Sequence, residues 1–201
     1  GKFGVPQKLF DGAYHGGVSA TKQLAVSGAR LLRARVAPSG KTVLNGIDTV
    51  WYGGEQACNV SLANDGSDRT AFLDFGGKTG AEFVGQSYRT HERLLIADAK
   101  GKLIQSVAAP KGYTFDHTEW VLGGSNYVVA TLANASGAHQ KIVLINLSDS
   151  TVTTLAEGDE LWHPCLWHSK NLYNSKELDT DSAGVYYLSS AYYSALELRD
   201  D

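Results

Sequence analysis

Short apolar runs separated by turn residues recur along the chain, and none of them has the period of an amphipathic helix. Each run is as long as a typical strand, and most are rich in β-branched or aromatic residues. The strongest runs cover 30–36 (RLLRARV), 69–75 (RTAFLDF), 127–133 (YVVATLA) and 184–190 (GVYYLSS). The pattern predicts an all-β protein.

Further short segments accompany each of these runs. One set, which predicts the next strand of each repeat, covers 43–48, 94–98, 142–147 and 195–199. Another set ends a predicted strand on glycine, at 7–12, 49–54, 107–112 and 153–158. The glycines recur at intervals close to the roughly 40 to 50 residues of a propeller blade. The sequence therefore predicts a repeated four-stranded meander.

The glycines divide the chain into four units, which are 13–54, 55–112, 113–158, and 159–201 together with 1–12. In the last unit an N-terminal strand would pair with the C-terminal strands and close the ring, leaving only short outer edges. We therefore expect one compact β-propeller domain of four blades over 1–201. A β-sandwich is the alternative, because short strands with frequent turns also occur in two packed sheets.

Composition narrows the classes of partner. A formal net charge of -3 and scattered basic residues leave no positive field to attract nucleic acid. No apolar run approaches the roughly twenty residues that span a bilayer, so membrane insertion is not expected. Cys58 and Cys165 lack the close spacing of a zinc site. They are either one long-range disulfide or two thiols.

Three segments carry a resemblance to a known family. They are 59–72 (NVSLANDGSDRTAF), 117–125 (HTEWVLGGS) and 163–169 (HPCLWHS). They resemble the Trp-Ser-Pro-Asp-Gly-Lys signature of TolB-like, WD40-like propellers, although Ser19 and Ser61 replace the Trp in two copies. The chain is also similar to paralogous surface or secreted proteins of fibre-degrading gut bacteria. The resemblance implies a secreted or cell-surface binding or scaffolding module, and not an enzyme.

The segments that follow the glycines should gather on one face near the central channel. They combine aromatic rings with carboxylates, amides and imidazoles, which suits a sugar, since a ring stacks on its apolar face while polar groups bond its hydroxyls. The candidate ligand-binding residues are His15, Trp51, Tyr52, Glu55, Gln56, Asp116, His117, Trp120, Glu160, Trp162, His163 and Trp167.

Each candidate also has a purely structural interpretation. Trp120 and Trp167 stand where such repeats fill the space between blades, whereas Trp162, and Trp51 with Tyr52, are better candidates for exposed platforms. His15, His117 and His163 share a register and could converge on a metal ion. Histidines at strand starts more often cap turns, and the second unit offers Gln56 or Ala57 there. No metal or other cofactor is expected.

Two functions follow as hypotheses. The first is a non-catalytic module that binds plant polysaccharide, with an enzyme domain as its partner in a longer polypeptide. The second is a protein-interaction scaffold, which an apolar patch without a stacking groove would favour. An enzyme acting on polysaccharide comes third. It would need a facing pair of carboxylates such as Asp116 and Glu119, and the chain has no Gly-x-Ser-x-Gly nucleophile turn.

Overall fold

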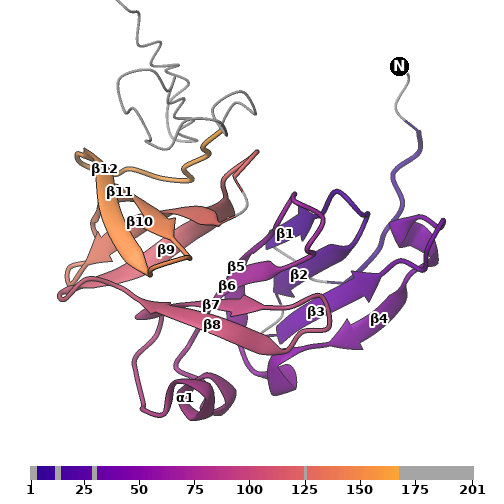
Figure 1. Cartoon of the computed structure of the whole chain (residues 1–201), viewed down its shortest axis with the longest axis horizontal. Coiled ribbons are helices and arrows are strands. Elements are labelled where there is room, and N and C mark those ends of the chain that lie inside the picture. The colour runs from indigo at the N-terminus through magenta and orange to yellow at the C-terminus, as the bar shows by residue number, and fades with distance from the viewer. Residues whose placement is uncertain (1–3, 12–14, 29–30, 125, 168–201) are drawn as a thin grey trace, which may run out of the picture.

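The strands of the residues that the structure describes form three separate four-stranded antiparallel sheets, which stand side by side in Figure 1. The computed structural model describes residues 4–11, 15–28, 31–124 and 126–167. Within each sheet the strands pair in chain order, as in a meander. The first sheet consists of β1 (His15–Val18), β2 (Leu24–Gly28), β3 (Leu31–Val36) and β4 (Ile47–Val50).

The other two sheets repeat this plan. The second contains β5 (Ala57–Leu62), β6 (Thr70–Asp74), β7 (Arg93–Ala97) and β8 (Leu103–Ala108). The third contains β9 (Tyr113–Trp120), β10 (Tyr127–Asn134), β11 (His139–Asn146) and β12 (Thr151–Glu157). The all-β class is thus confirmed, and the expected units 13–54, 55–112 and 113–158 each contain one sheet. Most of the fourth unit lies outside the described residues.

The first unit differs from the expected strand order. The run 30–36 forms the third strand of its sheet, because Leu24–Gly28 already forms the second. The expected strand at 43–48 is wrong in its first half, where Val43–Asn45 forms a 3-10 turn. The Thr42 hydroxyl donates to Asn45 Oδ1 across 3.0 Å, which holds this turn, and β4 begins only at Ile47.

The described N-terminal residues form no strand, in contrast to the strand expected at 7–12. Leu9 and Phe10 instead contact the first sheet. Arg35 donates a hydrogen bond to the main-chain oxygen of Leu9 across 2.8 Å, and the guanidinium groups of Arg33 and Arg35 both lie over the Phe10 ring.

The second sheet carries an insertion that the hydrophobic pattern does not predict. α1 (Lys78–Val84) lies between β6 and β7 and ends at Gly85, whose φ of 80° is left-handed. The Glu55 carboxylate accepts a hydrogen bond from the Thr79 main-chain N across 3.2 Å and so anchors the start of the helix. This insertion accounts for the longer interval between the second and third glycines. α1 lies at one edge of the molecule in Figure 1.

Hydrophobic side chains fill the spaces between neighbouring sheets. One cluster joins the first and second sheets and includes Leu32, Phe72 and Leu95. A second cluster joins the second and third sheets and includes Phe115 and Trp120. A third lies on the far face of the third sheet, where Leu161 and Leu166 of the following segment pack against it. The second sheet is therefore packed on both faces, and the third is packed between the second sheet and the segment that follows it.

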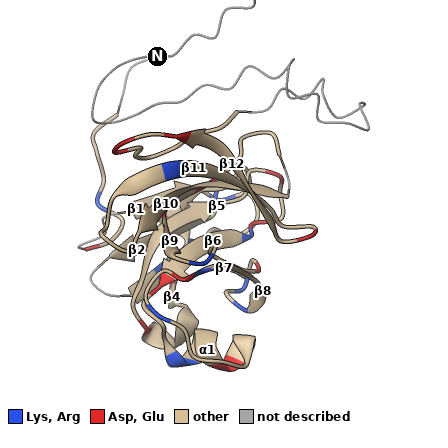
Figure 2. Ribbon diagram, turned by 90° about the vertical axis from the view of Figure 1, so that its left-hand side faces the viewer, with Lys and Arg blue, Asp and Glu red and all other residues tan. Residues whose placement is uncertain are grey.

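Charges of both signs are spread over the surface. Lys and Arg are interspersed with Asp and Glu over strands, loops and α1 (Figure 2). No described helix is long and apolar enough to span a membrane. Cys58 and Cys165 are both free thiols and are partly buried.

Candidate functional site

The first strands of the three sheets, β1, β5 and β9, lie next to one another where the sheets meet, with β5 in the middle. β1 and β5 approach so closely that a Cβ added to Gly17 would lie 2.7 Å from the main-chain N of Leu62. β5 and β9 are joined by side chains, since the Thr118 hydroxyl donates to the main-chain oxygen of Asn59. The inner strands therefore form one continuous wall.

β5 and β9 carry the same β-bulge at the same height. In β5 the register with β6 shifts between Cys58 and Ser61, and in β9 the register with β10 shifts between Asp116 and Glu119. Two residues of the inner strand thus lie opposite one residue of its partner, which bends the strand and redirects a side chain. The equivalent of His117 in the second sheet is therefore Asn59, and not Gln56 or Ala57.

The first residue of each bulge has a left-handed backbone. φ is 50° at Asn59 and 46° at His117, and His163 in the segment after the third sheet has a φ of 48°. This region is disfavoured for residues other than glycine, although Asn and His adopt it more readily than most. Three successive units thus hold the same strained conformation, and such strain is concentrated at functional sites.

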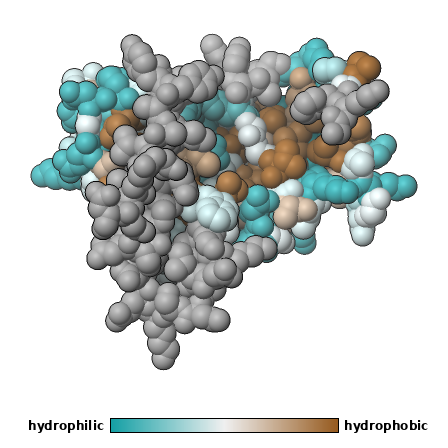
Figure 3. Space-filling model, turned by 90° about the horizontal axis from the view of Figure 1, so that it is seen from above, coloured by the Kyte–Doolittle hydropathy of each residue, from teal (hydrophilic) through white to brown (hydrophobic). Residues whose placement is uncertain are grey.

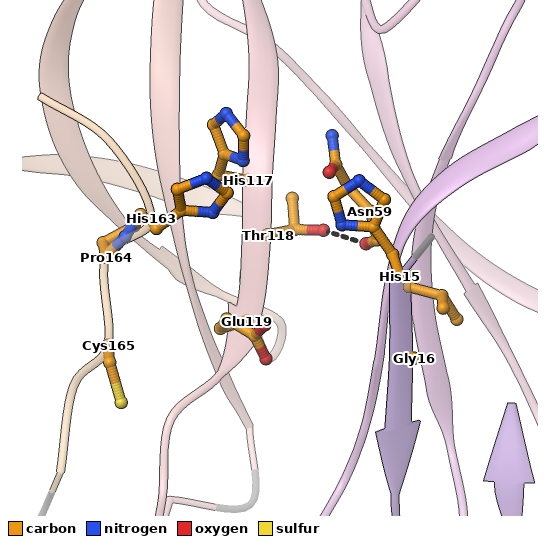
Figure 4. A pocket seen from close by; sticks show the side chains of 10 residues that line it. His15, Gly16, Asn59, His117, Thr118, Glu119, His163, Pro164 and Cys165 are labelled. Atoms are coloured by element: carbon orange, nitrogen blue, oxygen red, sulfur yellow. Dashed lines mark hydrogen bonds between the residues drawn. The ribbon is translucent and has the colours of Figure 1, made fainter. Parts of the chain in front are cut away.

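These redirected residues line a cavity of about 350 Å³. In Figure 4, His117 and His163 lie on one side of it and His15 and Asn59 on the other, with Thr118 between them. Its walls are His15, Gly16, Asn59, Val60, His117, Thr118, Glu119, His163, Pro164 and Cys165. The cavity therefore draws residues from β1, β5, β9 and the segment that follows β12.

Hydrogen bonds between sheets fix the lower wall of the cavity. The Ser61 hydroxyl donates to Glu119 Oε2 across 2.7 Å and accepts from the Trp120 main-chain N across 3.1 Å. The Trp120 indole N–H donates to the Ser61 main-chain oxygen across 3.1 Å. Trp120 is buried between the sheets, so it holds the wall in place and offers no stacking face.

Asp116 is the centre of a polar network behind the cavity. Its Oδ1 accepts from Asn59 Nδ2 across 2.5 Å and from the His117 main-chain N across 2.9 Å. Its Oδ2 lies 2.8 Å from His139 Nε2. Burial alone would raise the pKa of this carboxyl, but the hydrogen bond from His139 and the neighbouring imidazoles hold it below its ordinary value.

The imidazoles and one indole pack against each other in this region. Ring centroids lie 3.8 Å apart for His117 and His163, and 3.6 Å apart for His139 and Trp162. Burial lowers the pKa of His117 to about 4, despite the opposing effect of Asp116, and the other histidines add to the lowering. His117 is therefore a neutral imidazole at pH 7. The cavity wall offers donors and acceptors without a strong positive charge.

The structure brings six of the candidate residues together. His15, His117 and His163 line the cavity, and Asp116 and Trp162 lie behind it. Glu160 accepts a hydrogen bond from the Trp162 indole across 2.8 Å and is exposed.

The other candidates lie elsewhere, apart from Trp120, which is buried below the cavity. Trp51 packs over Gly101, where an added Cβ would meet its ring atoms at 2.5 Å. Tyr52 is buried and donates its hydroxyl to Asp74, so its ring is no platform. Glu55 binds the start of α1, and Gln56 is exposed next to it in the chain. Trp167 is 54% exposed and pairs with Leu122 outside the cavity.

Several residues of the site are absent from the candidate list. Asn59, Thr118, Glu119 and Cys165 line the cavity, and His139 bonds Asp116. An alignment of the units on Asn59, His117 and His163, in place of the glycines, would have found the lining residues. His139 gives no such signal, because it lies at the start of β11 and reaches the site only through the sheet pairing.

No protein-family model matches the chain, and no curated protein matches it. Among solved structures the chain is similar to the WD40 domain of Neurospora crassa Pan2, with 12% sequence identity and a TM-score of 0.36. The match covers 71% of this chain and 33% of that one, so the chain spans about a third of the structure it matches. The all-β fold is defined by the three four-stranded sheets of the described residues.

Proposed function

We propose that the chain is a non-catalytic binding module for carbohydrate, and that the sugar occupies the cavity at the inner strands. The observation that carries this proposal is the left-handed backbone shared by Asn59, His117 and His163, which all line one cavity. Such convergence costs backbone strain in each unit, and a ligand gives that strain a function.

The size and chemistry of the cavity suit a sugar residue of a plant polysaccharide. A volume of about 350 Å³ falls within the range of small-ligand sites, roughly 300 to 1,000 Å³. Imidazole, amide, hydroxyl and carboxylate groups supply both donors and acceptors for sugar hydroxyls. The exposed ring of His163, backed by the rings of His117 and Trp162, provides the stacking surface.

The distribution of carboxylates supports binding over hydrolysis. Glycoside hydrolysis requires two carboxyl groups flanking the scissile bond. Among the described residues that line the cavity, Glu119 is the only carboxylate. Asp116, the second member of the expected pair, lies behind the wall and is held by Asn59, His117 and His139.

The proposal includes a ring of four blades, with the fourth formed by 159–201. Two features of the described residues support it. Residues 159–167 follow the third sheet as an inner strand would, with the Leu122 main-chain N donating to Leu166 across 2.9 Å and Leu161 packing on Val129 and Ile142. The first sheet also bears exposed apolar side chains, Val18, Ile47 and Val50, and hydrophobic surface gathers over that half of the molecule in Figure 3.

The test is a titration of the purified chain with soluble plant polysaccharides and their oligosaccharides by calorimetry. The variant His163→Gly removes an exposed ring from the cavity wall while glycine accepts the φ of 48°. The variant Trp167→Ala is the control, because it removes a ring outside the cavity. We expect at least about a tenfold loss of affinity in His163→Gly, or about 1.4 kcal/mol, and none in Trp167→Ala. Absence of binding to every glycan, or equal losses in both variants, would reject the proposal.

A protein-interaction scaffold is the second candidate. A separate hollow of about 520 Å³ lies between the turns after β1, β5 and β9, with Ala20, Gly66 and Val121 among its walls. Leu122 follows Val121 of this hollow in the chain and is exposed. Trp167, which pairs with Leu122, is exposed as well. An apolar surface of this kind is typical of protein contacts. This function becomes the leading one if no glycan binds.

A further inference from the structure

Three potential metal ligands meet behind the cavity. Asp116, His117 and His139 each offer an atom, and these atoms all lie within 4.8 Å of one another. Asp116 Oδ2 lies 3.4 Å from His117 Nε2 and 2.8 Å from His139 Nε2. The three residues come from two strands of one sheet, since Asp116 and His117 belong to β9 and His139 to β11.

Two of these separations are close to those of a small coordination shell, and the third pair of ligand atoms lies within 4.8 Å. Zinc bonds of about 2.0 to 2.1 Å in tetrahedral geometry place neighbouring ligand atoms about 3.3 Å apart. The distance from Asp116 to His117 already has this value within a tenth or so of an ångström, and the distance to His139 is somewhat shorter. An ion could replace the proton between Asp116 and His139 after small side-chain rotations, without movement of the backbone.

Unsatisfied ring nitrogens point to a missing ligand. Both nitrogens of His117 and the Nδ1 of His139 are buried and have no hydrogen-bond partner. The His139 side chain is only 9% exposed and that of His117 only 11%. A buried polar atom without a partner is rare and requires an explanation such as an ion or a water molecule. A bound cation would satisfy the Nε2 atom of His117.

Neighbouring groups hold the three ligands in place. Asn59 and the His117 main-chain N donate to Asp116 Oδ1, which leaves Oδ2 directed at the imidazoles. The His139 ring stacks on Trp162, and Glu160 Oε2 lies 4.0 Å from its Nδ1. Outer groups of this kind orient the ligands in metal sites and strengthen binding.

We propose that Asp116, His117 and His139 bind a divalent first-row transition ion, with Zn²⁺ as the best-suited ion. Two imidazoles and one carboxylate are ligands that such ions prefer. His163, whose ring lies 3.8 Å from that of His117, is also at the wall of the cavity. The ion would be reached from the same cavity as the sugar.

The test measures Zn²⁺ binding to the chain without a histidine tag, after dialysis against a chelator and then into metal-free buffer. We expect one ion per chain by competition with a chromogenic chelator, and visible d–d absorption after substitution with Co²⁺. The variants Asp116→Asn and His139→Phe should each lower the Zn²⁺ affinity at least tenfold. His139→Phe keeps the ring that packs on Trp162.

His91→Asn is the matched control. His91 is also partly buried with a positive φ of 57°, but it lies 2.9 Å from Cys58 Sγ and outside the ligand set. This variant should bind Zn²⁺ as the unaltered chain does. Circular dichroism would confirm that each variant is folded. If His139→Phe does not fold, Asp116→Asn alone tests the ligand set. Absence of stoichiometric Zn²⁺ binding, or unchanged affinity in a folded ligand variant, would overturn the proposal. No glycan is present, so the outcome is independent of the proposed sugar binding.

Discussion

The Thr118 hydroxyl donates a hydrogen bond to the main-chain oxygen of Asn59 across 2.6 Å, and both residues belong to β-bulges in neighbouring sheets. This bond, drawn as a dashed line in Figure 4, joins the two bulges directly. Thr118 is fully buried, so the bond is shielded from water. The bulged geometry of β5 and β9 is therefore maintained jointly by the two sheets.

The variant Thr118→Val should destabilise the chain. It replaces the hydroxyl with a methyl group of similar size and leaves the buried Asn59 oxygen without this donor, which costs about 1 to 3 kcal/mol. The free energy of unfolding in urea measures the loss. Thr118→Ser retains the donor and should recover most of the stability. Equal stability of the Val and Ser variants would show that this hydrogen bond contributes little.

The contact between β1 and β5 predicts an effect of a single methyl group. An alanine Cβ at Gly17 would lie 2.7 Å from the Leu62 main-chain N and 3.2 Å from Ser61 Cα, so the two strands would have to separate. Overpacking of this kind costs about 1 to 3 kcal/mol. The control Gly158→Ala meets nothing closer than 3.6 Å and should leave the urea midpoint almost unchanged. Similar midpoints in both variants would contradict the close approach.

Stability should fall at alkaline pH. Burial and hydrogen bonds to Asp74 raise the pKa of Tyr52 and Tyr88, and burial raises the pKa of Cys58 to about 12. Between the unfolded and folded pKa values the unfolded chain loses these protons while the folded chain keeps them, so the free energy of unfolding decreases as pH rises. The decrease should begin near pH 9, from Cys58, and steepen above pH 10.

Urea midpoints from pH 8 to 11 measure this decrease. Tyr88→Phe loses the 2.8 Å hydrogen bond to Asp74 and should be less stable near neutral pH. It should also show a shallower decrease above pH 10, because one titrating group is gone. Midpoints that stay constant up to pH 11 would show that these hydroxyl and thiol groups are not shielded in solution.

The proposed ring of four blades predicts a definite size in solution. A compact domain of 201 residues should have a radius of gyration of roughly 17 Å. Small-angle X-ray scattering measures this quantity directly. A chain in which the fourth unit stays unfolded would give a clearly larger value and an elongated distance distribution, and that result would reject the closed ring.

The strand repeat was the part of the structure that the sequence made easiest to predict. Apolar runs such as 69–75 and 127–133 became β6 and β10, because an apolar run of this length between turns has few alternatives to a buried strand. α1 was missed because its stability comes from contacts outside itself. Glu55 binds its first turn, and Gly80 leaves room for the hydroxyls of Tyr52 and Tyr88.

The site was predicted only in part, for a related reason. His15, His117 and His163 were found by their register after the glycines, and the structure places all three around the cavity. The bulges shift that register by amounts that local sequence does not reveal, so Asn59 was passed over in favour of Gln56. Trp51 and Tyr52 share the same stretch of sequence but turn away towards Gly101 and Asp74.

The shared bulge separates the framework of the site from its selectivity. The left-handed position is held by main-chain pairing and by bonds between sheets, while the side chain at that position differs, being Asn in the second unit and His in the third and after it. The main chain at this position is thus the same whichever side chain it carries. Substitution among Asn, His and Gly at 59, 117 and 163 would change the side chains that line the cavity one position at a time, and the sheets would stay as they are.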